Sequence, residues 1–223
     1  MPSALPSAFV LAFRQLGDRR ILRVLAKSLA VTIVVFAGVG LALYRVIAGA
    51  AGGGTWTALA VLLATLAACW LAFRAVAVAV IGVFGDEVVQ AVEARHYPAA
   101  LATAVPVPLG RSLVMGLQSV GRLIGYNIVA APVYLALLAT GVGLPVGFLV
   151  VNGWLLGRDL GDMVAARHVS RDTLGAWRYA TRWARFGVGL ASAGLFLVPV
   201  VNLIAPIVGA AAMTHIFHRR RTT

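Results

Sequence analysis

The chain has 223 residues, of which 61% are hydrophobic and only 12% are charged. A soluble domain usually carries about 25% charged residues, so this composition excludes an ordinary soluble domain and indicates a membrane protein. In so apolar a chain, the formal net charge of +12 is typical of anchoring to anionic lipids on the cytoplasmic side rather than of nucleic-acid binding. The single Cys69 excludes an internal disulfide and a multi-cysteine metal site.

Residues 1–27 are basic, and no cleavable signal peptide is recognisable because the first long apolar run begins only after Lys27. The apolar residues of this segment recur at spacings of three and four, which predicts a short helix lying on the membrane surface.

Two long apolar runs follow. Residues 28–44 carry no charge. Crossing a bilayer takes about 20 residues, and the charged residues on either side extend this run to that length because their long side chains reach the interface. After a glycine-rich loop, residues 55–84 predict a second span containing Arg74, which is either an interfacial anchor or a charge on a transport pathway. Because no positive residue lies between residues 46 and 73, the positive-inside rule places the N-terminus in the cytoplasm and the glycine loop outside.

A charged segment continues the second span. Residues 85–97 begin with Asp86 and Glu87 and end with basic residues, a pattern typical of a helix whose first-turn acids complement its dipole. Asp86 is alternatively a general acid or a metal ligand. The prolines of residues 98–110 predict a hinge loop.

The uncharged run of residues 123–157 is too long for one span and too short for two spans with a turn. Gly141, Gly143 and Pro145 divide it into arms at residues 126–140 and 146–156, each short of a full crossing. A re-entrant hairpin is therefore predicted, with one tilted, kinked span as the alternative.

Residues 158–171 have the spacing of an interfacial helix, in which Arg158 and Asp162 form an i,i+4 pair. Beyond them, four arginines fall on one helical face flanked by aromatic residues, which predicts contact with lipid headgroups or attraction of anions. These arginines are Arg171, Arg178, Arg182 and Arg185.

The last apolar run repeats this design, with arms at residues 187–198 and 207–217 divided by Pro199, Asn202 and Pro206. His215 and His218 are three residues apart and could share a metal ion. With no acid or cysteine beside them in the sequence, a basic interfacial tail is the preferred interpretation.

Together these segments predict an all-α integral membrane protein with two long transmembrane helices, two half-penetrating (re-entrant) helical hairpins and amphipathic interfacial helices. We expect a single membrane domain over residues 1–223 with both termini in the cytoplasm. Its parts are a basic N-terminus (1–27), two transmembrane helices (28–97), a first hairpin (109–157), basic amphipathic helices (158–186), a second hairpin (187–217) and a basic tail (218–223).

Three sequence blocks in the second half resemble one known family. They are residues 152–159 (NGWLLGRD), 163–168 (MVAARH) and 199–210 (PVVNLIAPIVGA). With an arginine-rich helix between the second and third blocks, their order and spacing are similar to those of the CysZ-type sulfate permeases and the related etoposide-induced-protein family. The resemblance covers about residues 145–217 and is looser over the first half.

The resemblance implies an oligomer of the bacterial inner membrane that passes sulfate passively for cysteine synthesis. Family members hold the anion near a Gly-aliphatic-Arg motif that opens the first long helix. This chain has Arg20-Ile21-Leu22-Arg23 there, so Arg23 matches, while Arg20 replaces the glycine and Ser28 replaces a usual proline. Lys27 adds a charge, and a helix N-terminus offers unpaired N–H groups to an oxyanion. The alternative is that these basic residues only anchor the chain.

Three further polar residues are candidates for a pore or hairpin role. Asn152 and Asn202 lie beside the hairpin breaks, where their amides either satisfy free backbone groups or line a polar path, and Arg158 follows the first hairpin.

Two functions remain open, an anion permease and a non-transporting membrane scaffold or regulatory protein. The scaffold would use small residues such as Gly187, Gly189 and Gly194 for contacts with other copies or partners. An enzyme has no support, since the sequence shows no paired carboxylates beside a histidine, no nucleotide-binding loop and no HExxH motif. We expect no cofactor and no nucleic-acid partner. The expected partners are sulfate or a similar oxyanion, anionic lipids and further copies of the chain.

Overall fold

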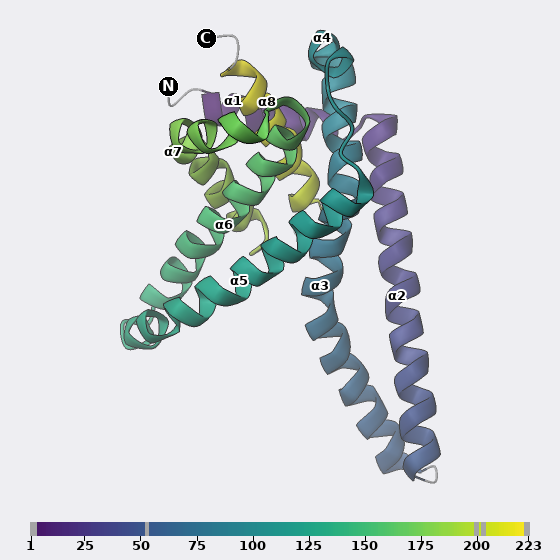
Figure 1. The fold of residues 1–223 in the computed structure, drawn as a ribbon. Coiled ribbons are helices and arrows are strands. Elements are labelled where there is room, and N and C mark those ends of the chain that lie inside the picture. Colours follow the sequence, from purple (N-terminus) through teal and green to yellow (C-terminus); the bar gives the residue numbers. More distant parts are fainter. Residues whose placement is uncertain (1–3, 52–53, 199–200, 202–203, 221–223) are drawn as a thin grey trace.

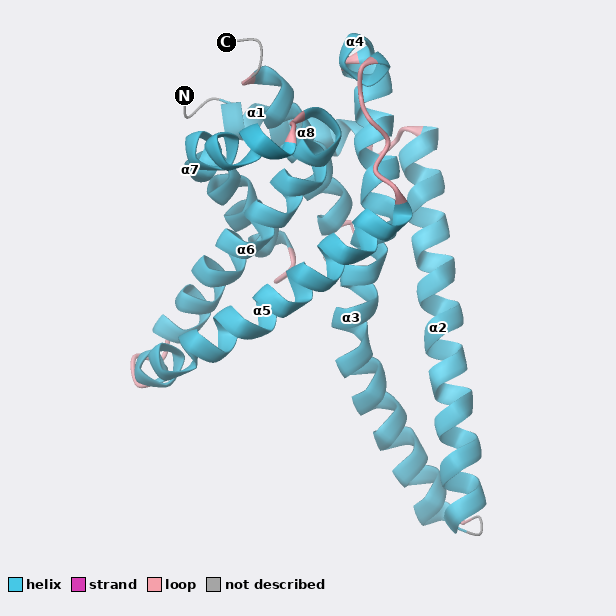
Figure 2. Cartoon of the chain, in the orientation of Figure 1, coloured by secondary structure: helices cyan, strands magenta, loops and turns pink. Residues whose placement is uncertain are grey.

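In the computed structural model, the described part of the chain comprises residues 4–51, 54–198, 201 and 204–220, and it consists of α-helices joined by turns and short loops (Figure 2). Its helices are α1 (Ala4–Gln15), α2 (Arg19–Ala51), α3 (Thr55–His96), α4 (Pro98–Ala102), α5 (Leu109–Leu138), α6 (Gly143–His168), α7 (Arg171–Leu195) and α8 (Ala205–Arg219). The all-α part of the predicted fold is therefore confirmed.

The two longest helices, α2 and α3, pack along each other and project away from the rest of the chain (Figure 1). The stretch Arg19–Ile47 reaches a mean hydropathy of 2.2 and is long enough to cross a membrane, as predicted for residues 28–44. The 42 residues of α3 include the second predicted span. At 1.5 Å per residue, α3 measures about 60 Å, about twice the thickness of a hydrocarbon core. The side chain of Arg74 lies outside the described residues.

The charged end of α3 corrects one expectation. The sequence predicts a first-turn position for Asp86 and Glu87, but α3 runs unbroken through both residues. Each acid instead pairs with another helix: Asp86 lies 3.0 Å from Arg167 of α6, and Glu87 lies 3.0 Å from Lys27 of α2. The change from apolar to charged residues therefore marks where α3 begins to contact charged neighbours, not where a helix begins.

Helices α5 and α6 form an open hairpin (Figure 1). The chain reverses at Gly141, whose φ of +72° lies in the left-handed region that favours glycine, and this confirms the predicted break. The first arm is longer than predicted, because α5 continues N-terminally past Arg122 and Arg111. The stretch Gly110–Leu138 is long and apolar enough to cross a membrane. The predicted bounds of this arm, residues 126–140, are therefore too short, since the charge of Arg122 is paired within the hairpin and does not end the helix.

The basic segments are continuous with the hairpin arms. α6 passes without a break through residues 157 and 158, where the sequence suggests a boundary, and α7 unites the arginine-rich face with the next arm. The loop between α4 and α5, which lies within the predicted hinge segment, is short, and Pro108 is the residue directly before α5. Pro199 and Asn202 lie outside the described residues.

The core gathers where α1, the end of α3, α6, α7 and α8 meet, at the end of the molecule that holds both termini (Figure 1). Helix α8 is its centre and is buried from Ala205 to His218 except at Pro206. The predicted surface helix is present as α1, but Ala8 and Ala12 are buried in the core, and α1 packs along α8. Helix α8 is therefore surrounded by other helices of the chain along almost its whole length.

Glycines bring α6 and α7 into close contact. A Cβ atom added to Gly157 would overlap the carbonyl oxygen of Arg185, and one added to Gly189 would overlap the carbonyl oxygen of Gly153. Gly153, Gly157 and Gly161 recur every four residues, the small-residue spacing that lets helix backbones approach. Gly189 therefore packs inside the chain, which corrects its assignment to a partner contact in the scaffold hypothesis.

Candidate functional site

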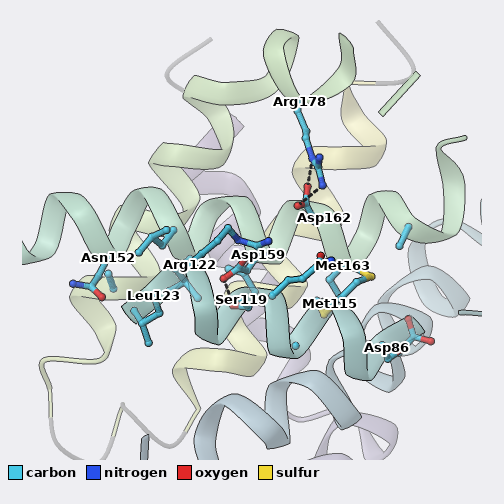
Figure 3. Close-up of a pocket in the computed structure, with 18 of the residues that line it drawn as sticks. Asp86, Met115, Ser119, Arg122, Leu123, Asn152, Asp159, Asp162, Met163 and Arg178 are labelled. Atoms are coloured by element: carbon cyan, nitrogen blue, oxygen red, sulfur yellow. Dashed lines mark hydrogen bonds and ion pairs between the residues drawn. The ribbon is translucent and has the colours of Figure 1, made fainter. Parts of the chain in front are cut away.

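A cavity of about 640 Å³ lies between α5, α6 and α7 (Figure 3). Most of its lining is apolar, including Met115, Phe148 and Leu156. Its charged lining residues are Asp86, Arg111, Arg122, Asp159, Asp162, Arg171 and Arg178. Polar groups converging on a largely apolar concave surface are typical of a small-ligand site.

An ion pair joins α5 and α6 at the cavity wall. Arg122 Nη2 lies 2.8 Å from Asp159 Oδ1, and the Ser119 hydroxyl donates a short hydrogen bond to the other oxygen of Asp159 (Figure 3). Ser119 and Arg122 are three residues apart on α5 and so share one helical face. These contacts hold the two arms of the hairpin together and neutralise one arginine.

A second ion pair joins α6 and α7. Arg178 donates to both oxygens of the buried Asp162, from Nε at 2.8 Å and from Nη2 at 2.7 Å (Figure 3). This two-bond geometry is the strongest form of the arginine–carboxylate pair. The predicted partner Arg158 also lies within ion-pair distance of Asp162, at 3.8 Å. The i,i+4 pair is therefore confirmed, but it is longer than the pair of Asp162 with Arg178.

Two arginines on the cavity wall keep an uncompensated charge. In the described part of the chain, Arg111 and Arg171 make no ion pair, whereas Arg122 and Arg178 are each bound to an aspartate. The remaining acid, Asp86, is bound to Arg167 behind the wall. The cavity therefore offers positive charge to an anionic ligand.

The arginine-rich face of α7 is divided between two roles. Arg178 and the buried Arg185 point inward, where Arg185 donates to the Arg178 carbonyl oxygen at 2.7 Å and to the Thr181 hydroxyl at 3.1 Å. Arg182 lies over the Tyr179 ring, 4.0 Å from its centroid, near the surface. The expectation that all four arginines face lipid headgroups or anions is thus wrong, because Arg178 binds Asp162 of α6 and the buried Arg185 donates to groups of its own helix.

The predicted anion-binding residues lie together on the first turns of α2, apart from the cavity lining. Arg20 and Arg23 are exposed, whereas Ile21 is buried in the core and Leu22 is exposed. Lys27 is engaged with Glu87, at 3.0 Å. Among the described residues, Arg23 makes no ion pair, so it keeps its charge for another partner.

A carboxylate of this chain already occupies the α2 N-terminus. Asp18 Oδ1 accepts a hydrogen bond from the Arg20 backbone N–H at 2.9 Å, and Asp18 Oδ2 lies 3.0 Å from Arg95. These contacts lower the pKa of Asp18 below its ordinary value, the backbone hydrogen bond from Arg20 being the largest cause. An oxyanion binding at this terminus would compete with Asp18.

The remaining predicted polar residues have separate positions. Asn152 lines the cavity and donates to the Phe148 carbonyl oxygen at 2.7 Å, a bond within its own helix. Arg158 lies beside Asp162 but does not line the cavity. Asn202 lies outside the described residues.

The histidines near the C-terminus are buried, so their assignment to an interfacial tail is wrong. His215 Nδ1 lies 2.9 Å from the Tyr97 hydroxyl, whereas His218 Nε2 lies 2.9 Å from Glu93 Oε1. Each histidine thus has its own partner on α3 or directly after it. The sequence could not show this, because these partners lie more than 100 residues away.

Sequence analysis also missed the two ion pairs of the cavity. Arg122 and Asp159 are 37 residues apart, and Asp162 and Arg178 are 16 apart, both beyond the reach of helical periodicity. One signal was present: with only seven acids in the chain, two that follow an apolar run at residues 159 and 162 imply buried partners.

These features define an all-helical membrane protein with a charged cavity among its helical hairpins. The chain matches the family described as Sulfate transporter CysZ/Etoposide-induced protein 2.4 over residues 8–206, and it therefore belongs to that family. A search of curated proteins finds no match.

Proposed function

We propose that this protein is a passive, channel-like permease for sulfate or a similar small oxyanion, located in the bacterial inner membrane and supplying sulfur assimilation. The family includes sulfate transporters, which supports transport as the function. The observation that carries the proposal is the cavity wall, where Arg111 and Arg171 keep uncompensated charge beside two neutralised arginines.

The balance of charges in the cavity suits passage rather than tight capture. Two available guanidinium groups match the charge of sulfate and offer planar N–H donors to its oxygens. Asp159 and Asp162 prevent Arg122 and Arg178 from adding to this attraction. An anion site that conducts must bind strongly enough to admit the ion and weakly enough to release it.

The start of α2 serves in this proposal as the first point of contact. Arg20 and Arg23 raise the local concentration of anions, and Lys27 adds to them when it leaves Glu87. The helix N-terminus supplies N–H groups when the Asp18 side chain swings aside. Asp18 then acts as a built-in competitor that keeps binding weak.

The proposed membrane arrangement has α2 and α3 crossing fully, both termini in the cytoplasm, and the α5–α6 and α7–α8 hairpins entering without crossing. Much of the outer face of α5 is apolar and exposed, with Val129 at 78% and Leu135 at 72%. Lipid tails or other protomers cover such a face, and the proposal includes a homo-oligomer that shields the polar path and anionic lipids at the basic surface.

The second candidate is a non-transporting membrane scaffold of the same fold. The same exposed face of α5 favours it, because an apolar helix face can serve protein contacts alone. The two functions differ in one measurable property, the movement of anion across a sealed membrane.

The test is uptake of radiolabelled sulfate into proteoliposomes, with chloride and phosphate as competitors. Saturable uptake that falls at least about tenfold in Arg111→Ala/Arg171→Ala supports the permease, since both available cavity charges are lost. Arg14→Ala is the matched control, because it removes an exposed arginine of α1 away from the cavity. Folded wild-type protein without uptake above empty liposomes supports the scaffold instead.

A further inference from the structure

All four histidines of the chain gather in one cluster, although they lie at residues 96, 168, 215 and 218. The rings of His168 and His218 are 5.0 Å apart, and those of His96 and His215 are 5.1 Å apart. The cluster joins the end of α3, the end of α6 and α8, at the end of the molecule where both termini lie (Figure 1). It is separate from the cavity residues.

Two of these histidines converge on one carboxylate. His168 Nε2 lies 2.6 Å from Glu93 Oε1, and His218 Nε2 lies 2.9 Å from the same oxygen. The three groups place their ligand atoms within 4.8 Å of one another. His215 does not join this set, because its Nδ1 lies 2.9 Å from the Tyr97 hydroxyl.

The group of Glu93, His168 and His218 is buried and short of positive charge. Glu93 is 0% exposed, and the side chains of His168 and His218 are 1% and 5% exposed. The one guanidinium within ion-pair distance of Glu93 in the described part of the chain belongs to Arg167, 3.7 Å from Oε2, and it also pairs with Asp86 at 3.0 Å. With neutral imidazoles, two carboxylates therefore share one cation, and a buried negative charge needs a further one.

One acceptor also remains unused. Glu93 Oε2 is buried and, among the described residues, has no hydrogen-bond partner. A carboxylate with one oxygen facing two imidazole nitrogens and the other without a hydrogen bond is well placed to bind a metal ion through either oxygen or both.

We propose that Glu93, His168 and His218 bind a divalent first-row transition-metal ion, with Zn²⁺ as the best fit. Two imidazoles and one carboxylate form a nitrogen and oxygen donor set that suits zinc and leaves one position for water. Zinc bonds of about 2.0 Å require ligand atoms about 3.3 Å apart, which small rotations of these side chains provide. The ion fastens α8 to α3 and α6.

The test uses the untagged full-length chain in detergent, stripped with a chelator and titrated with Zn²⁺ by calorimetry and with Co²⁺ by visible absorption. We expect one ion per chain, a tetrahedral Co²⁺ spectrum and a higher Tm in Zn²⁺, because binding to the folded state alone stabilises it. Wild-type protein that binds no stoichiometric metal overturns the proposal. That result is expected if the histidines instead balance the negative charge of Glu93 by holding a proton.

The variants His168→Ala and Glu93→Gln each remove one ligand and are expected to weaken Zn²⁺ binding at least about 100-fold. His96→Ala is the matched control, since His96 lies in the same cluster, is exposed and is not a ligand. Equal loss of binding in His96→Ala and His168→Ala overturns the assignment of ligands. If a ligand variant does not fold, the wild-type titration decides alone.

Discussion

The guanidinium of Arg122 on α5 faces the carboxylate of Asp159 on α6, with 2.8 Å between Nη2 and Oδ1. The two side chains are 23% and 27% exposed, so water screens the pair only in part. The bond joins the two arms of a hairpin whose inner surface is otherwise largely apolar. It therefore fixes both the spacing of α5 and α6 and the charge of the cavity wall.

Removing Arg122 is expected to reduce both stability and transport. Arg122→Ala leaves Asp159 without its ion-pair partner, at a cost of about 1 kcal/mol for a partly exposed pair, or a fall in Tm of about 2–4 °C. It also turns one neutral pair into a negative charge that repels anions. The measurements are thermal unfolding in detergent and sulfate uptake in proteoliposomes.

The double variant Arg122→Ala/Asp159→Ala separates these two effects. It restores the net charge of the cavity wall without restoring the bond between the helices, so uptake is expected to recover toward the wild-type rate while Tm stays low. Uptake as poor in the double variant as in Arg122→Ala would show that charge does not control the rate.

Asp18→Asn is expected to strengthen anion binding at the start of α2. Asparagine caps a helix as well as aspartate does, so the hydrogen bond to the Arg20 N–H is kept, while the competing charge is removed. The expected result is a lower half-saturation concentration for sulfate uptake. No change, together with normal uptake by Arg23→Ala, would place the anion site elsewhere and leave the cavity as its location.

The same carboxylate sets a pH dependence of stability. The pKa of Asp18 is below its ordinary value of 3.8, because the ionised form accepts the Arg20 N–H bond and pairs with Arg95. Its stabilising contribution is fully present above about pH 3.8 and disappears as the pH falls through the folded-state pKa. Wild type and Asp18→Asn should therefore converge in Tm in acid, and a difference that persists under strong acid would contradict this account.

Close packing of α6 on α7 predicts a large effect from one methyl group. Gly157→Ala places a Cβ against the backbone carbonyl of Arg185, which cannot rotate away, so we expect a loss of about 1–3 kcal/mol in the free energy of unfolding. Gly175→Ala on α7 is the control, because its Cβ would meet no atom within 4 Å. This control should be neutral or more stable by up to about 1 kcal/mol, since alanine favours helix. Equal Tm values for the two variants would contradict the close contact.

Sequence periodicity located the helices because membrane helices satisfy their own backbone hydrogen bonds, and the apolar runs that form them are visible along the chain. It also located the reversal at Gly141, where the turn requires a positive φ, which glycine adopts readily. It placed boundaries wrongly at charged residues. Arg122 lies within α5, and Arg158 lies within α6, because charges that are paired with an acid do not end a helix.

The candidate sites were harder to predict than the fold. The anion-binding residues proposed from the α2 motif do lie together, since they are neighbours in one helix. The Arg122–Asp159 pair and the group of Glu93, His168 and His218 depend on how distant helices pack, and no local pattern records that packing. The few acids and four histidines of the sequence still indicate that such pairs exist, since each buried charge needs a partner.

The depth of the α5–α6 hairpin is open to a direct test by cysteine labelling. Because Cys69 is the only cysteine of the chain, its replacement by serine gives a background for single cysteines. In the proposed arrangement Val142→Cys at the hairpin tip, 74% exposed in the isolated chain, does not react with a membrane-impermeant reagent added from outside. Gly54→Cys, in the loop between α2 and α3, reacts from outside, and Thr103→Cys, after α4, reacts only from the cytoplasmic side. Outside labelling of Val142→Cys would show that α5 crosses fully, which its length permits, and would replace the re-entrant hairpin with two further crossings.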